Sequence, residues 1–184
     1  MQPSPLIAVL DANVLYPFTL RDTLLRAAAA GLFQVRWSDK ILDEATHNLV
    51  ADHVVTEQQA TRLRAAMTAA FPDARVIGFD KLVATMRNDP KDRHVAAAAV
   101  KAKAQVVVTL NVRDFRRLPD GINAQTPDQF LVSLFNGQPR LLIDIVHEQS
   151  VALRRPPRSF AEVVSALARV VPVFAGRVLA YSSE

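Results

Sequence analysis

Residues 6–13 read LIAVLDAN, five apolar residues followed directly by Asp11, Ala12 and Asn13. An unbroken apolar run of this length is typical of a strand that is buried on both faces, as in a parallel sheet. Residues 105–110 repeat the pattern with three consecutive valines and predict a central strand. Both runs end at polar residues. These two segments therefore indicate the core of a parallel sheet.

Helical patterns separate the predicted strands. Residues 17–30 begin with proline and are followed by Gly31, which is the usual punctuation of a helix, and Ser38 can cap the next one. The other predicted elements are strands at residues 35–38 and 75–79 and helices at residues 57–70, 89–103 and 127–135. Strands that alternate with helices predict a doubly wound α/β fold, in which helices flank a mainly parallel sheet.

The chain changes character at Gly137. Two helices, at about residues 141–153 and 159–170, are predicted beyond it, and no clear strand. We therefore expect an α/β domain over residues 5–136 and a C-terminal helical extension over residues 137–184.

Composition narrows the class of protein. Half of the residues are hydrophobic and there is no cysteine, which excludes disulfides and thiolate metal sites and predicts a reducing compartment. Residues 6–10 are too short for a signal-peptide core, and Pro172 breaks the longest late apolar run. We expect a cytoplasmic protein without a membrane span. The net charge of +4 permits a nucleic-acid partner but does not establish one.

Polar side chains follow the two central strands. In parallel α/β sheets, ligands bind at the carboxyl ends of the strands, near a topological switch point. Asp11 follows the first strand, and Asn111 and Asp114 follow the later one. We expect these side chains to reach the same edge of the sheet.

Two further carboxylates come from helices. At about 100° per residue, Asp92 falls on the apolar side of its helix, where a carboxylate needs a reason to be. Glu44 flanks an apolar stripe, whereas Asp43 points away from it, so Glu44 is the better candidate. His94 is expected at the surface of its helix.

A set of carboxylates with no thiol and no histidine cluster indicates an oxygen-rich site, which suits Mg²⁺ or Mn²⁺ better than zinc. Such ions can bind a phosphate and lower the pKa of an attacking water. No nucleophilic side chain is then needed, in keeping with the lack of a Ser-His-Asp or Cys-His arrangement. Asn13 and Thr109 are candidates for orienting the carboxylates.

Four segments in order resemble the acidic motifs of PIN domains, and specifically those of VapC-type toxins: residues 9–15, 39–44, 89–98 and 108–115. The resemblance implies a PIN-like nuclease domain that cuts structured RNA, commonly tRNA or rRNA, with the help of a divalent metal. It also implies a cognate antitoxin and, from the class as a whole, a homodimer. By the same match, Asp11, Glu44 and Asp92 bind metal. The family often has Asp where this chain has Asn111, so either Asn111 or Asp114 completes the acidic set.

Basic residues surround these motifs. Arg93, Arg113, Arg116, Arg117 and His94 could hold RNA beside the metal, and the arginines could equally form a solvated rim. Residues 154–158, rich in arginine, are expected to be a polar linker or to bind RNA or the antitoxin.

Two alternatives stay open. A catalytically impaired PIN-like module that only binds RNA or protein is favoured by Asn111, although three retained carboxylates would repel one another without a metal. A phosphatase of the haloacid-dehalogenase type also places Asp after its first strand, but it needs a second Asp two residues later for acid–base chemistry. This chain has Asn13 there.

Overall fold

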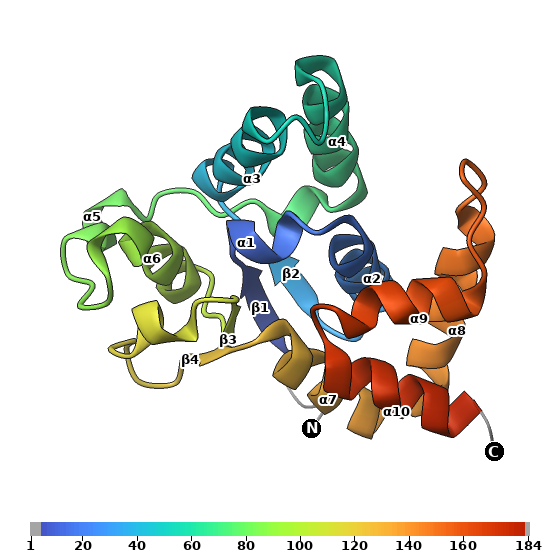
Figure 1. Ribbon diagram of the computed structural model, residues 1–184. Helices are drawn as coiled ribbons and strands as arrows, with labels where there is room; N and C mark the ends of the chain where they lie inside the picture. The colour runs from blue at the N-terminus through green and yellow to red at the C-terminus, as the bar shows by residue number, and fades with distance from the viewer. Residues whose placement is uncertain (1–4, 183–184) are drawn as a thin grey trace. The chain divides into compact units, whose positions relative to one another are not determined.

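The structure, a computed structural model, describes residues 5–182. Four short strands form one parallel sheet in the order β2-β1-β3-β4 (Figure 1). The strands are β1 (Ile7–Leu10), β2 (Gln34–Arg36), β3 (Val106–Val108) and β4 (Asn123–Gln125). Ala8 on β1 pairs with Val35 on β2 and with Val106 on β3. The chain builds outward in one direction from β1 to β2 and in the other from β3 to β4, so the switch point lies between β1 and β3.

The described chain separates into two compact units. The first comprises the residues up to Tyr16 and Phe33–Gln125, and therefore holds the whole sheet. Its helices and turns are α1 (Ala12–Leu15), α3 (Asp39–Ala51), α4 (Glu57–Ala70), η1 (Pro72–Ala74), α5 (Asp80–Val83), η2 (Pro90–Asp92), α6 (Arg93–Lys101) and η3 (Val112–Phe115).

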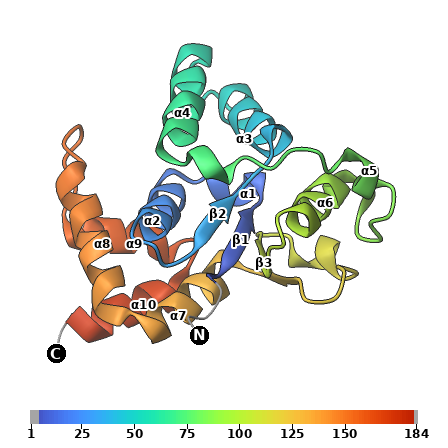
Figure 2. The same cartoon turned by 180° about the vertical axis from the view of Figure 1, so that it is seen from behind.

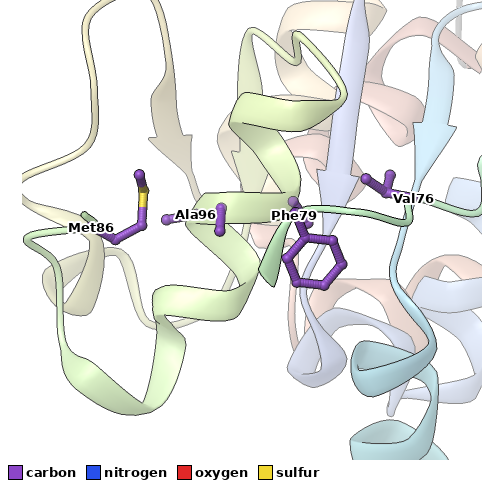
Figure 3. Close-up of a cluster of buried hydrophobic side chains, with 6 residues drawn as sticks. Val76, Phe79, Met86 and Ala96 are labelled. Carbon is purple, nitrogen blue, oxygen red and sulfur yellow. The ribbon is translucent and has the colours of Figure 1, made fainter. Parts of the chain in front are cut away.

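Helix α6 packs against β1 and β3 with a run of fully buried small side chains, from Val95 to Ala99. The segment before it covers its other side, where Val76, Phe79 and Met86 pack on Ala96 and the following alanines (Figure 3). Because α6 leads directly into β3, which runs back alongside it, the N-terminus of α6 lies toward the carboxyl edge of the sheet. The switch point and the start of α6 therefore share that edge.

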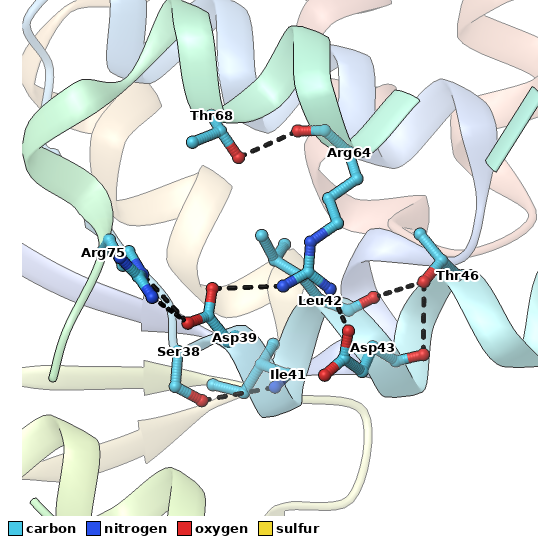
Figure 4. A network of polar contacts seen from close by, with 9 residues as sticks. All are labelled: Ser38, Asp39, Ile41, Leu42, Asp43, Thr46, Arg64, Thr68 and Arg75. Carbon is cyan, nitrogen blue, oxygen red and sulfur yellow. Dashed lines mark hydrogen bonds and ion pairs between the residues drawn. The ribbon is translucent and has the colours of Figure 1, made fainter. Parts of the chain in front are cut away.

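Helices α3 and α4 lie side by side (Figure 2) and are joined by ion pairs. Arg64 on α4 binds Asp43 and Asp39 on α3, with 3.1 Å between Nη2 of Arg64 and Oδ1 of Asp39 (Figure 4). Arg75 donates from Nε to the other oxygen of Asp39 at 2.9 Å. Ser38 caps α3 through a 3.2 Å bond from the Ile41 amide, as predicted. These contacts fix the first two turns of α3, which carry Glu44.

The second unit comprises Pro17–Leu32 and the residues from Thr126 onward. It is helical, with α2 (Phe18–Ala29), α7 (Pro127–Gly137), α8 (Pro139–Ala152), α9 (Phe160–Ala168) and α10 (Pro172–Ser182). Helix α8 packs against α2 and α9, and α10 packs against α7, α8 and α9. The carboxylate of Asp128 accepts the backbone N–H groups of Val173 (3.1 Å) and Phe174 (2.8 Å), which caps the start of α10. None of the described helices is long and apolar enough to cross a membrane.

The predicted fold class is confirmed: a parallel sheet flanked by helices, with further helices toward the C-terminus. The strand predicted at residues 75–79 is wrong. Only Arg75 forms a bridge, to Trp37, because Val76 and Phe79 turn onto α6 and Gly78 bends the backbone with φ of +72°. Two further elements were not predicted: β4, which lacks an apolar pattern, and α10, which begins at the proline that was expected to interrupt an apolar run.

The domain boundary predicted between residues 136 and 137 stays a prediction. The packing units divide the chain elsewhere, because α2 and α7 pack with the C-terminal helices and belong to the second unit.

Candidate active site

Asp11 is held rigidly at the carboxyl end of β1. It caps α1 by accepting the Ala12 amide at 2.8 Å, and its Oδ2 accepts the Thr109 hydroxyl at 2.7 Å and the Asn13 amide at 3.0 Å. The side chain is 5% exposed. Burial raises the pKa of Asp11 even though all three hydrogen bonds act to lower it. The result is a fixed carboxylate in an environment that disfavours its charge.

Thr109 and Asn13 form the support for Asp11, as expected of groups that orient a carboxylate. Asn13 Nδ2 also donates to Thr109 Oγ1 at 3.1 Å, and Asn13 Oδ1 accepts the Leu110 amide at 3.0 Å. Asn13 therefore joins the ends of β1 and β3 across the switch point. Its amide holds Asp11 in place and cannot serve as the acid that phosphatase chemistry of the haloacid-dehalogenase type requires.

Asp11, Glu44 and Asp92 line one open cavity of about 450 Å³. Glu44 extends from α3 and its side chain is 39% exposed. Asp92 stands at the N-cap of α6, and its Oδ2 is buried without a hydrogen-bond partner. The structure thus brings together three of the five carboxylate and amide candidates.

The electrostatics of these carboxylates are unfavourable. Burial, followed by the charge of Asp11, raises the pKa of Asp92 to about 6, against the opposing effect of Lys91. Burial also raises the pKa of Glu44, and the charges of Asp11 and Asp43 add to it, while Lys40 acts to lower it. The pKa of all three carboxylates is raised, and the charge of Asp11 contributes to the shift at both Glu44 and Asp92, so the cluster lacks sufficient countercharge.

A divalent cation would suit this donor set. Hard oxygen ligands are those that Mg²⁺ and Mn²⁺ prefer, and the unpartnered Oδ2 of Asp92 is available as one. Within residues 5–182, however, no three Asp, Glu or His side chains stand close enough together to hold an ion as they are. Asp11 is fixed, so closer approach would have to come from Glu44 and Asp92.

The expectation that His94 lies at the surface is wrong. The side chain is 4% exposed, and its Nε2 lies 3.1 Å from Oε1 of Glu44 without the alignment of a hydrogen bond. Burial, with a smaller effect of Lys40, lowers the pKa of His94 to about 4, so the ring is neutral at pH 7. The periodicity of α6 carries no information about α3, which brings Glu44 beside His94.

Asn111 and Asp114 do not line this cavity. Asn111 is exposed at the start of η3 and donates its backbone N–H to Thr109 Oγ1 at 3.0 Å. Asp114 forms a 2.9 Å ion pair with Lys91, yet its charge still contributes to the raised pKa of Asp92. Asp114, Arg93 and Arg113 line a second, neighbouring cavity instead.

Other residues of the cavity were not singled out from the sequence. His47 and Asn48 line it, and their spacing of three and four residues from Glu44 on α3 was the available signal. Asp43 also lines it, although its carboxylate is bound by Arg64. Nothing in the local sequence pattern distinguishes Asn88, which is buried beside the second cavity.

Comparison with known proteins bears on this geometry. A family model described as PIN domain matches residues 8–113, and one described as VapC50 C-terminal domain matches residues 127–180. A protein of Mycobacterium tuberculosis (strain ATCC 25618 / H37Rv), named "Putative ribonuclease VapC50", is 34% identical over 114 residues, which are 60% of this chain and 65% of the relative. The chain therefore matches less than two thirds of the length of that protein. No solved structure matches the chain.

Proposed function

Because the chain belongs to the PIN-domain family, we propose that it is a divalent-metal-dependent endoribonuclease that cleaves structured RNA of the tRNA or rRNA class. It acts as the toxin of a toxin–antitoxin pair and is silenced by a cognate antitoxin protein. Similarity to the relative named as a ribonuclease supports the reaction, and similarity to the VapC50 C-terminal domain supports the toxin assignment.

One observation carries the proposal. Asp11, Glu44 and Asp92 converge on a single cavity, and each has a raised pKa. A cluster of carboxylates that costs free energy in the folded protein needs a compensating function, and binding a cation removes the cost. The impaired-module alternative does not account for this cost.

Each carboxylate would hold Mg²⁺ or Mn²⁺ in a different way. Asp11 offers a pre-positioned oxygen, since Thr109 and Asn13 fix its carboxylate. Asp92 offers the unpartnered Oδ2, and Glu44, on the exposed side, is free to adjust. The bound ion would neutralise the scissile phosphate and lower the pKa of the attacking water. Lys91 keeps Asp114 outside the cavity through their ion pair, so we propose three metal-binding carboxylates, with Asp114 as a nearby charge.

The decisive test is incubation of the purified protein with total RNA, followed by mapping of the new 5′ ends. Cleavage is expected when Mg²⁺ or Mn²⁺ is present. No cleavage is expected when EDTA is added, or from the Asp11→Asn and Asp92→Asn proteins. Asp73→Asn, an exposed carboxylate change outside the cavity, is the matched control and should cleave normally. Cleavage that persists with EDTA and in both cavity variants contradicts the metal mechanism. Binding of RNA without any cleavage favours the impaired module.

The partner assignments need separate tests. The protein should be co-expressed with the product of the gene next to its own, which is the candidate antitoxin. The expected result is a complex that no longer cleaves RNA. The homodimer stays a prediction. Light scattering on the purified protein would test it by measuring the oligomeric state.

A further inference from the structure

A second cavity, of about 360 Å³, lies beside the acidic one and has the opposite character. Five arginines and one buried asparagine contribute to its lining: Arg87, Arg93, Arg113, Arg116, Arg117 and Asn88. Over residues 5–182, none of these five guanidinium groups forms an ion pair with a carboxylate. We call this the arginine pocket.

Asn88 distinguishes the pocket from an ordinary basic surface. It is 5% exposed, and neither its Oδ1 nor its Nδ2 has a hydrogen-bond partner. Leaving a buried amide unsatisfied on both atoms is costly. An amide in this state, lining a cavity, is suited to a ligand that accepts a hydrogen bond at one point and donates one at the next.

The pocket stands on a fixed base. The Asp89 amide donates to the Asp114 carbonyl at 2.9 Å, and Lys91 binds the Asp114 side chain at 2.9 Å, so the two arginine-bearing segments are tied together. Asp89 and Asp114 are the two carboxylates in the lining. The carboxylate of Asp89 accepts a hydrogen bond from the Lys91 amide at 3.1 Å. The five guanidinium groups outnumber these two carboxylates, so the lining is positively charged overall.

One segment of the chain contributes to both the arginine pocket and the acidic cavity. Asn88 lines one and Asp92, four residues later, lines the other. The charge of Asp114, which lines the arginine pocket, contributes to the raised pKa of Asp92, which lines the acidic cavity. A polyanion whose scissile phosphate lies at the acidic cavity therefore has a neighbouring place of positive charge for its adjoining phosphate.

We propose that the arginine pocket binds a backbone phosphate of the RNA substrate, with Asn88 donating to a phosphate oxygen and accepting the adjacent ribose 2′-hydroxyl. This inference rests on the proposed ribonuclease function. Guanidinium groups are the side chains best suited to phosphate oxygens, and a 2′-hydroxyl is both donor and acceptor, so it distinguishes RNA from DNA. An acidic protein segment could supply the anions but has no hydroxyl fixed beside each one.

The test measures binding rather than cleavage. Fluorescence anisotropy in EDTA, with a labelled single-stranded RNA and the DNA of the same sequence, gives affinities that do not depend on the metal or on catalysis. Arg116→Gln/Arg117→Gln is expected to weaken RNA binding about tenfold and to flatten its dependence on salt, since each lost phosphate contact lowers the slope by about 0.7. Arg62→Gln/Arg169→Gln, two exposed arginines elsewhere, is the matched control and should bind RNA as the parent does.

Asn88→Leu sharpens the assignment. The substitution keeps the size of the side chain and removes both polar atoms, so the preference for RNA over DNA should fall while the thermal stability holds or rises. An unchanged preference in a folded Asn88→Leu protein, or unchanged RNA affinity in the double arginine variant, overturns the proposal. Loss of affinity for polyglutamate but not for RNA also overturns it, in favour of a protein ligand. Failure of the proposed function would appear separately, as absence of cleavage by the parent protein.

Discussion

Helix α3 carries two kinds of carboxylate, and the contrast between them separates structure from site. Asp39 and Asp43 are bound by Arg64 (Figure 4), and hydrogen bonding from Arg75 holds the pKa of Asp39 below its ordinary value. Glu44, one residue further on, has a raised pKa and faces the acidic cavity. Neighbouring residues on a helix point about 100° apart, and that rotation decides which carboxylate receives an arginine.

The two groups act on stability in opposite directions. Ion pairs such as those of Asp39 are partly exposed and contribute modestly, roughly 0.2–1 kcal/mol each. Asp11, Glu44 and Asp92 instead make the folded state less favourable when they are charged. We therefore expect the loss of a paired carboxylate to leave cleavage largely intact, and the loss of charge at Glu44 or Asp92 to leave folding largely intact.

The largest effect is expected from Asp11→Asn. An asparagine keeps the shape of the side chain but loses its charge, and it disturbs the hydrogen bonds from Thr109 and Asn13. The rate of RNA cleavage should therefore fall by at least about a hundredfold. That is the upper end of the loss in activity seen when a residue that supports a metal ligand is changed. Initial rates of cleavage measure this, with circular dichroism as the check on folding. An active Asp11→Asn protein would erase the distinction between the two groups.

The next effect concerns the support for that carboxylate. Thr109→Val removes the hydroxyl that donates to Asp11 and is expected to weaken Mn²⁺ binding by about 10–100-fold, as measured by calorimetry. Thr109→Ser keeps the hydroxyl and should restore most of the affinity. Equal affinities for the valine and serine variants would show that the bond does not matter for the ion.

A stability measurement tests the unpaired group without any reaction. Asp92 has a pKa of about 6 in the folded protein, above its ordinary 3.8, so its contribution to stability is greatest below pH 4 and is lost as the pH rises through 6. Asp92→Asn should therefore stabilise the EDTA-treated protein at pH 7.5 by about 1 kcal/mol, which is less than full linkage predicts because the cavity is open to solvent.

Thermal melting of the parent and of Asp92→Asn, at pH 4 and pH 7.5, measures the difference. Added Mg²⁺ should raise the melting temperature of the parent more than that of the variant. A variant that is less stable than the parent at pH 7.5 in EDTA contradicts the view that burial and the charge of Asp11 make ionised Asp92 unfavourable.

The smallest effect is expected from the paired group. Arg64→Gln removes both ion pairs to α3 and should lower the free energy of unfolding by roughly 0.5–1 kcal/mol, as measured by urea denaturation. Mn²⁺ affinity should stay within about twofold, because Arg64 does not line the acidic cavity and the side chain of Asp43 is 66% exposed. A large loss of metal affinity would mean that Asp43 belongs with the unpaired carboxylates.

Much of this arrangement could be predicted from the sequence. The apolar runs located β1 and β3, and the position of Asp11 after a strand followed from geometry alone. Asp92 was expected within a helix, on its inner side, but α6 begins at Arg93 and Asp92 stands at its N-cap. Those rules depend only on the residue's own element. Their success ends where a second element decides the environment.

His94 and Asn88 show that limit. His94 is buried because α3 brings Glu44 beside it, and Asn88 is buried where its loop is tied to the segment holding Asp114. Neither contact leaves a mark in the local pattern of apolar residues. The short strand β4 was not predicted for a related reason. Asn123–Gln125 pairs with β3 through its backbone and has no alternation of apolar residues that would indicate a strand.

The bond between Thr109 and Asp11 joins residues 98 positions apart, and this has a consequence during synthesis. A nascent chain on the ribosome has made Asp11 long before β3 and Thr109 emerge from the exit tunnel, so its first carboxylate stays unsupported for most of translation. Under the proposed function, the ribosome making this protein and the tRNAs that serve it would be exposed to an assembled nuclease only late in synthesis, when more than half of the polypeptide is already complete.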